Sequence, residues 1–263
     1  MYAFELVNPS TVADASAAIK SSGGKALAGG QSLIGAMKLR LAQPGTLVDL
    51  SGIAELKGIS QDAAGLTIGA FATHAQVQDS DIVKHALPAL AGLAGKIGDR
   101  QVRNMGTLGG AIAHNDPAAC YPAAVVALNA TIRTNLRTIA ADAFFTGMYE
   151  TALAEGEIIT SVTFPIPTKA GYVKFPNPAS RFALVGVFVA QWPDGARVAV
   201  TGAASCVFRS SALEDALSRE FTVDAARSVT LDASGLNGDL HASPEYRAHL
   251  IPVIAARAVA AAG

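Results

Sequence analysis

The stretch KALAGGQSLIGAMKLRLAQPGTLVDLS, residues 25–51, decides how the chain begins to fold. Residues 25–30 predict a short strand that ends in a glycine pair. Residues 32–42 predict a helix, because leucine and methionine recur every four positions along one face. The motif QPG at 43–45 breaks this helix, and residues 46–51 predict another strand.

The residues before this stretch show the same alternation. Residues 2–7 predict a strand, and residues 8–24 predict a helix with Ser10 as its N-cap and Gly23 and Gly24 as its stop signal. Five alternating elements in about fifty residues predict a small parallel sheet with right-handed crossovers.

The pattern changes after residue 55. Two strands around a turn are predicted near 56–70, followed by helical sequence at 73–98 that is broken at Pro88. Strand-like runs follow, and a proline-rich stretch at 165–180 predicts a domain boundary. Beyond it, an antiparallel meander and helices complete the chain. We therefore predict domains at 1–167, divided into about 1–55 and about 56–167, and at 168–263.

Composition narrows the functional class. The 263 residues are 51% hydrophobic and 16% charged, with a formal net charge of −1, which disfavours a nucleic-acid partner. Two distant cysteines support neither a disulfide framework nor a zinc or iron–sulfur site. No signal-peptide pattern or membrane span is apparent, so we expect a cytoplasmic protein.

A second glycine loop, MGTLGGAIAHNDP, spans residues 105–117. Glycine pairs let backbone N–H groups approach a ligand closely, and at a helix start such groups stabilise a phosphate. The alternative interpretation of each loop is a plain tight turn. Neither loop is a G-x-G-x-x-G or Walker A motif, which disfavours a Rossmann dehydrogenase and a nucleoside triphosphatase.

The sequence has no recognisable metal-binding or nucleophile motif. The five histidines lack metal-ligand spacing, and no G-x-S-x-G motif occurs. His114 is the only histidine in a glycine loop, where a loop-capping role is the alternative to a functional one. A chain that binds an anion without a protein nucleophile suits a cofactor that carries the chemistry.

The segments AGGQSLIGAMKLRLAQPGTLVDLS and GTLGGAIAHNDPAACYPAAVVALNA together resemble the FAD-binding medium subunit of molybdenum hydroxylases. This group includes carbon monoxide dehydrogenase medium subunits and the flavin domain of xanthine dehydrogenase. The resemblance continues through GEIITSVTFPIP, YVKFPNPASRFALVGVFVA and the C-terminal segment, so it covers nearly the whole chain. It implies an α+β fold: a two-part vanillyl-alcohol-oxidase-like (PCMH-type) FAD-binding domain, then a domain of a three-stranded antiparallel sheet plus helices.

The resemblance also implies which residues bind FAD. Both glycine loops would hold the pyrophosphate and its neighbourhood through backbone N–H groups. In many relatives a histidine stands at the position of Gln31, and an acidic residue at that of Cys120, whose sugar or ribityl contact Asp116 could take instead. Ordinary strand core is the alternative for Ile159 and Phe182, and a plain surface lysine for Lys174. The implied set is Ala28, Gly29, Gly30, Gln31, Ser32, Leu33, Ile97, Thr107, Leu108, Gly109, Gly110, Ala111, Asp116, Cys120, Ile159, Lys174 and Phe182.

The implied activity is that of an oxidoreductase subunit, an FAD-dependent dehydrogenase component that is active only in a complex. A small subunit with two [2Fe–2S] clusters would deliver electrons from a large subunit with the molybdopterin cofactor, in a dimer of heterotrimers. The FAD would pass them to NAD⁺, a quinone or O₂. The alternatives are a flavin-free scaffold or assembly subunit and a stand-alone flavin oxidase.

Overall fold

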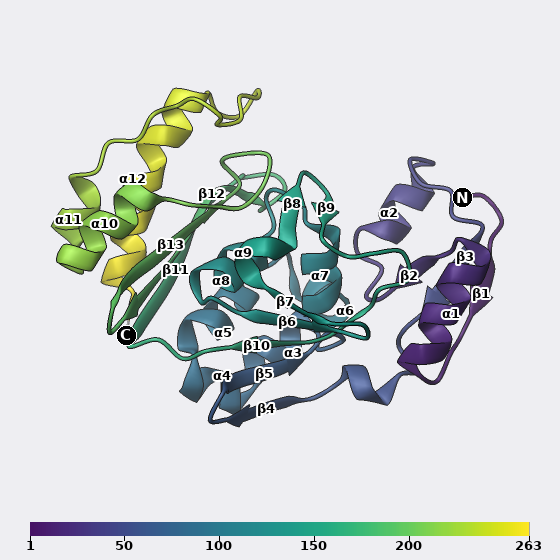
Figure 1. The fold of residues 1–263 in the computed structure, drawn as a ribbon. Coiled ribbons are helices and arrows are strands. Elements are labelled where there is room, and N and C mark those ends of the chain that lie inside the picture. Colours follow the sequence, from purple (N-terminus) through teal and green to yellow (C-terminus); the bar gives the residue numbers. More distant parts are fainter. Residues whose placement is uncertain (263) are drawn as a thin grey trace.

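The computed structural model describes residues 1–262. A small unit at the N-terminal end contains a parallel three-stranded sheet in the order β1-β3-β2 (Figure 1). This confirms the predicted sheet. Its elements are β1 (Glu5–Val7), α1 (Val12–Ser22), β2 (Lys25–Leu27), α2 (Leu33–Lys38) and β3 (Thr46–Asp49).

Two local predictions for this unit are wrong. The N-cap of α1 is Thr11, whose hydroxyl accepts a hydrogen bond from the Asp14 N–H at 3.1 Å, and not Ser10. Helix α2 ends at Lys38, so it is shorter than the predicted 32–42. Arg40 has a φ of 60° and ends the helical path, which leaves the Leu41 side chain in solvent and out of the predicted apolar stripe.

The middle of the chain builds a five-stranded antiparallel sheet in the order β4-β5-β10-β6-β7. The predicted helical segment after residue 73 divides into three helices, and the last begins at Pro88, where a kink or break is predicted. The elements are η1 (Ala54–Leu56), β4 (Ile59–Asp62), β5 (Gly65–Gly69), α3 (His74–Asp79), α4 (Asp81–Ala86), α5 (Pro88–Gly95), α6 (Arg100–Met105), α7 (Leu108–His114), α8 (Tyr121–Ala127), β6 (Thr131–Thr134), β7 (Thr138–Ala140), α9 (Ala141–Phe144), β8 (Phe145–Gly147), β9 (Glu150–Thr151) and β10 (Ile159–Phe164).

The C-terminal part has a four-stranded antiparallel sheet, β11-β12-β13-β14, rather than three strands alone. The additional strand β14 has only two residues. The predicted boundary between 167 and 168 lies in the connection from β10 to β11 and stays a prediction. The elements are β11 (Lys169–Pro176), β12 (Ala183–Trp192), β13 (Gly195–Thr201), β14 (Phe208–Arg209), α10 (Ser211–Arg219), α11 (Val223–Arg227) and α12 (Pro244–Ala260).

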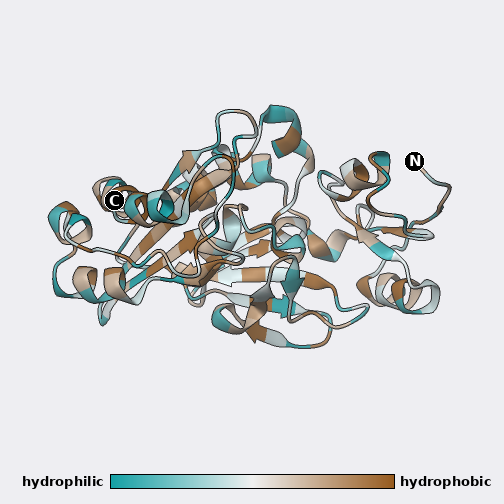
Figure 2. Ribbon diagram, turned by 90° about the horizontal axis from the view of Figure 1, so that it is seen from above, coloured by the Kyte–Doolittle hydropathy of each residue, from teal (hydrophilic) through white to brown (hydrophobic). Residues whose placement is uncertain are grey.

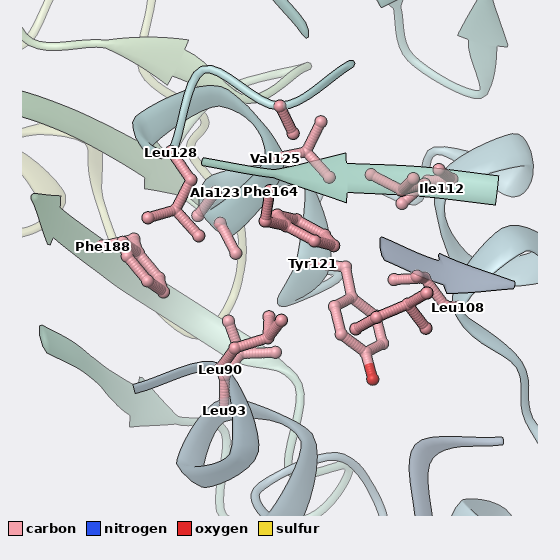
Figure 3. Packing of buried hydrophobic residues seen from close by; sticks show 14 of the residues in the cluster. Leu90, Leu93, Leu108, Ile112, Tyr121, Ala123, Val125, Leu128, Phe164 and Phe188 are labelled. Carbon is pink, nitrogen blue, oxygen red and sulfur yellow. The ribbon is translucent and has the colours of Figure 1, made fainter. Parts of the chain in front are cut away.

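Strand β12 joins two hydrophobic cores. Val185, Val187 and Val189 pack with the C-terminal helices, whereas Phe188 belongs to the large core of the middle sheet and its helices. Figure 3 shows Phe188 in that core, in which Tyr121 and Phe164 are also buried. The strands of the C-terminal sheet are mostly brown, that is hydrophobic, in Figure 2, as expected for strands that are covered on both faces. One face of the C-terminal sheet therefore packs on the middle part of the chain, and the other face packs on the C-terminal helices.

Within residues 1–262, no helix combines the length and the apolar character that a membrane crossing requires.

Candidate cofactor site

The first glycine loop, Ala28–Leu33, connects β2 to α2. Gly30 has a φ of 70°, a left-handed conformation that glycine adopts without steric cost. In the described part of the chain, none of the backbone N–H groups from Gly29 to Leu33 donates to another protein group. Because unpaired backbone donors need an acceptor, this run of free N–H groups can bind an anionic ligand.

The two glycine loops are in direct contact. A Cβ atom on Gly29 would overlap the carbonyl oxygen of Met105 and lie 2.8 Å from the Gly106 Cα. A Cβ on Gly110 would lie 3.4 Å from the Cβ of Ala28. The glycines thus allow two segments that are distant in sequence to form one surface.

The second loop differs from the prediction that both loops offer free N–H groups. The Gly109 N–H donates to the Ala70 carbonyl at 2.8 Å, and the Gly110 N–H to the Thr107 hydroxyl at 3.1 Å. The N–H groups of Leu108 and Ala111 also have protein acceptors. The glycines of this loop therefore serve close packing, since a Cβ on Gly109 would lie 2.6 Å from the Ala70 Cβ.

His74 packs against the second loop. A Cβ atom added to Gly106 would lie 2.5 Å from the His74 Nε2. Burial, together with the positive charge of Arg103, lowers the pKa of His74 to about 4. The ring packs against Tyr121 at 5.3 Å between centroids. At neutral pH the imidazole is therefore uncharged, so the side chain that packs against the second loop carries no charge.

Cys120 and Lys174 are brought together from different elements. The buried Cys120 Sγ lies 3.6 Å from the Lys174 Nζ, which also donates to the Arg181 carbonyl at 2.8 Å. Lys96 approaches the same region and donates to the Tyr172 carbonyl at 3.2 Å. Burial lowers the pKa of Lys96, the nearby Cys120 raises it, and the charge of Lys174 lowers it. Two lysines therefore lie beside the Cys120 thiol.

Three predicted residues lie in apolar surroundings or at the surface. Ile97 is half-buried against the large core, and Ile159 is buried in β10 within that core. Phe182 is 50% exposed. Ile159 is thus buried in a strand, and its contact with the cofactor stays a prediction.

An open pocket of about 310 Å³ lies between the middle and C-terminal parts of the chain, and it includes Asp116 and Phe182 of the predicted set. The Asp116 carboxylate accepts from the Ala118 N–H at 2.8 Å, an ordinary turn contact. Burial raises the pKa of Tyr149, and so does the adjacent carboxylate of Asp116. A larger pocket of about 360 Å³, near Asp142, contains none of the predicted residues.

Sequence reasoning missed Tyr149, Asn177 and Arg247, which line the same pocket. They come from β8–β9, the end of β11 and α12, and none stands in a recognisable motif. The sequence signal that could have located the β8–β9 hairpin is Asn115, which stands next to Asp116 in the second loop and binds this hairpin. Asn115 is fully buried with a φ of 45°, and its Nδ2 donates to the carbonyls of Gly147 and Glu150 at 2.8 Å each.

Replacing Asn115 with alanine should lower the free energy of unfolding by about 2 kcal/mol, because the buried Asn115 side chain loses its hydrogen bonds to two partly buried carbonyls. Proteolysis in the β8–β9 hairpin should also become faster, since Asn115 attaches it to the second loop. Urea unfolding and limited proteolysis measure the two effects. Asn129 is the matched control: it has a φ of 50° but is exposed, so Asn129→Ala isolates the backbone contribution. Equal losses from both variants would contradict the hairpin contact.

Comparison with known proteins gives consistent matches along the chain. Residues 2–167 match the family described as the FAD binding domain in molybdopterin dehydrogenase. The nicotine 6-hydroxylase medium subunit of Paenarthrobacter nicotinovorans is 34% identical, with 99% of this chain and 98% of the relative covered. A solved structure of carbon monoxide dehydrogenase from Hydrogenophaga pseudoflava matches with a TM-score of 0.88 at 34% identity, covering 99% and 97%. Quinoline 2-oxidoreductase from Pseudomonas putida 86 gives a TM-score of 0.90 at 28% identity, covering 98% and 96%.

Proposed function

The chain belongs to the family of FAD-binding medium subunits of molybdenum hydroxylases, and on that premise we propose that it relays electrons from a partner subunit to an external acceptor. It is an oxidoreductase subunit with FAD as its cofactor. When bound, FAD supplies the redox chemistry, since it accepts and releases electrons singly or in pairs. The protein supplies the binding surface and the environment of the ring.

The first glycine loop carries this proposal. Its free N–H groups from Gly29 to Leu33 fit the pyrophosphate of FAD, which needs several donors at close range. The absence of a side chain on Gly29 keeps the second loop against this surface. We propose that the second loop, with Thr107 and Gly110, shapes the same site by packing rather than by donating its N–H groups.

We propose that Lys174 contacts the cofactor near Cys120 as a hydrogen-bond donor. A thiol is a poor acceptor, whereas the Lys174 ammonium can donate to a hydroxyl or carbonyl of the cofactor. Asp116 remains available to accept from a sugar or ribityl hydroxyl, because its turn contact uses one carboxylate oxygen. With these assignments, Asp116 in the second loop accepts a hydrogen bond from the cofactor and Lys174 in β11 donates one.

The iron–sulfur clusters must belong to another subunit. The chain has only two cysteines, and a [2Fe–2S] cluster of the usual type needs four. Within residues 1–262, no group of three or more potential ligands could hold a metal ion. We therefore propose an iron–sulfur partner that donates electrons and a molybdenum partner that oxidises the substrate.

The test is to purify the full chain alone and titrate it with FAD. We expect a yellow protein, or an apoprotein that binds one FAD with quenching of the flavin fluorescence. We expect no substrate oxidation by the chain alone and restored activity when the partner subunits are added. A folded, colourless chain that takes up no FAD would disprove the proposal. Turnover without partners would favour a stand-alone oxidase.

A further inference from the structure

The turn that joins β11 to β12 contains a residue in a strained conformation. Arg181 has a φ of 63°, in the left-handed region that residues with a side chain rarely adopt. Its side chain is exposed, so packing of the guanidinium does not account for this conformation. A strained backbone persists only where its surroundings hold it, and such residues cluster at functional positions.

Backbone and side-chain hydrogen bonds hold this turn in one shape. The Asn177 N–H donates to the Phe182 carbonyl at 2.8 Å, and the Arg181 N–H donates to the Asn177 carbonyl at 2.9 Å. The Oδ1 of the buried Asn177 also accepts from the N–H groups of Ala179 and Ser180, at 2.9 and 3.2 Å. The direction of the Arg181 carbonyl is therefore set by the turn.

The Arg181 carbonyl accepts a hydrogen bond from the Lys174 ammonium at 2.8 Å. A second hydrogen bond of this ammonium runs to the Cys120 Sγ at 3.6 Å. An ammonium has three N–H groups, so one of them remains for a ligand. Within residues 1–262, no carboxylate lies within ion-pair distance of Lys174 or of the neighbouring Lys96. The third N–H and the charge of Lys174 are thus available to an acceptor outside the protein.

We propose that Arg181 is a positioning residue for FAD binding. Its left-handed backbone directs its carbonyl at the Lys174 ammonium, and this contact places the third N–H of Lys174 for an acceptor atom of the cofactor. Lysine has a long and flexible side chain, so fixing it costs conformational entropy. Because the turn fixes Lys174 before FAD binds, binding does not bear that cost. The inference rests on the proposed function and on the Lys174 contact proposed within it.

The test compares two variants of Arg181 in the full chain, with FAD affinity measured by quenching of flavin fluorescence. Both variants remove the guanidinium. Arg181→Gly accepts the left-handed conformation without steric cost, so the carbonyl stays in place. Arg181→Pro fixes φ at about −65° and turns the carbonyl away. We expect Arg181→Gly to bind FAD like the wild type, and Arg181→Pro to bind about fivefold more weakly, as the release of one flexible side chain predicts.

Lysine variants show whether the effect passes through Lys174. Lys174→Met removes the ammonium and should weaken FAD binding about tenfold. Adding Arg181→Pro to Lys174→Met should cause no further loss, whereas a separate role of the turn would make the two losses additive. Lys169→Met is the matched control, because Lys169 is exposed at the other end of β11, and it should leave FAD affinity unchanged.

Urea unfolding of each apoprotein verifies that the variants fold. If Arg181→Pro does not fold, Arg181→Val decides in its place. Valine keeps the backbone N–H but, as a β-branched residue, resists the left-handed region. We expect Arg181→Val to bind FAD more weakly than Arg181→Gly.

The outcomes separate this inference from the proposed function. If the wild-type chain binds no FAD, the proposed function fails. If the wild type binds FAD and Lys174→Met binds it equally well, the Lys174 contact and this inference are both wrong, while FAD binding stands. If Lys174→Met weakens binding but the proline and glycine variants bind alike, or if the losses are additive, only the positioning role of Arg181 is overturned.

Discussion

Replacing Gly29 with alanine should lower FAD affinity about 100-fold and the free energy of unfolding by about 3 kcal/mol. The added methyl group would overlap the Met105 carbonyl oxygen and press on the Gly106 Cα. These are backbone atoms, so no side-chain rotation relieves the overlap, and the two loops must separate. Isothermal titration with FAD and urea unfolding of the apoprotein measure the two effects.

Gly35→Ala provides the matched control for this prediction. Gly35 lies in α2, close to the first loop, and nothing lies within 4 Å of an added Cβ. Alanine should therefore stabilise the helix by up to about 1 kcal/mol and leave FAD binding unchanged. Wild-type FAD affinity in Gly29→Ala would show that contact between the loops does not shape the cofactor site.

Replacing Glu157 with glutamine should cost about 3 kcal/mol of stability at neutral pH. The buried Glu157 carboxylate accepts from the Thr134 hydroxyl at 2.7 Å, the Ala154 N–H at 2.8 Å and two nitrogens of Arg137 at 3.0 Å. Hydrogen bonds from Arg137, Ala154 and Thr134 together lower the pKa of Glu157 to about 2, against the opposing effect of burial.

The pH dependence follows from the direction of this shift. The carboxylate is preferred in the folded state, so its contribution is complete above the unfolded pKa of 4.5. It is lost as the pH falls from 4.5 toward 2. The difference in unfolding free energy between wild type and Glu157→Gln should therefore shrink over this range. Glu155→Gln, an exposed neighbour, should change stability little at any pH. A pH-independent difference for Glu157→Gln would contradict the assignment.

The general architecture could be predicted because its signals are local. Alternating strand and helix patterns predict the parallel sheet, and Pro88 predicts a kink or break in the helical segment. Local signals are weaker at element ends, where several residue types can cap a helix. Thr11 rather than Ser10 caps α1, and Arg40 rather than the QPG motif ends α2. These choices depend on backbone conformations that composition and periodicity do not specify.

The candidate site, too, could be predicted only in part from local sequence signals. By itself, the sequence determined that two glycine loops stand where backbone approaches closely, because only glycine lacks the Cβ atom. Only the tertiary structure decided which loop keeps its N–H groups free. The carbonyls of Ala70 and Ala72 accept hydrogen bonds from the second loop, whereas no protein group accepts from the N–H groups of the first loop. Only the fold joins Tyr149, Phe182 and Arg247 in one pocket. Hydrogen-bond acceptors and pocket walls come from segments far apart in the chain, so their meeting depends on packing between domains.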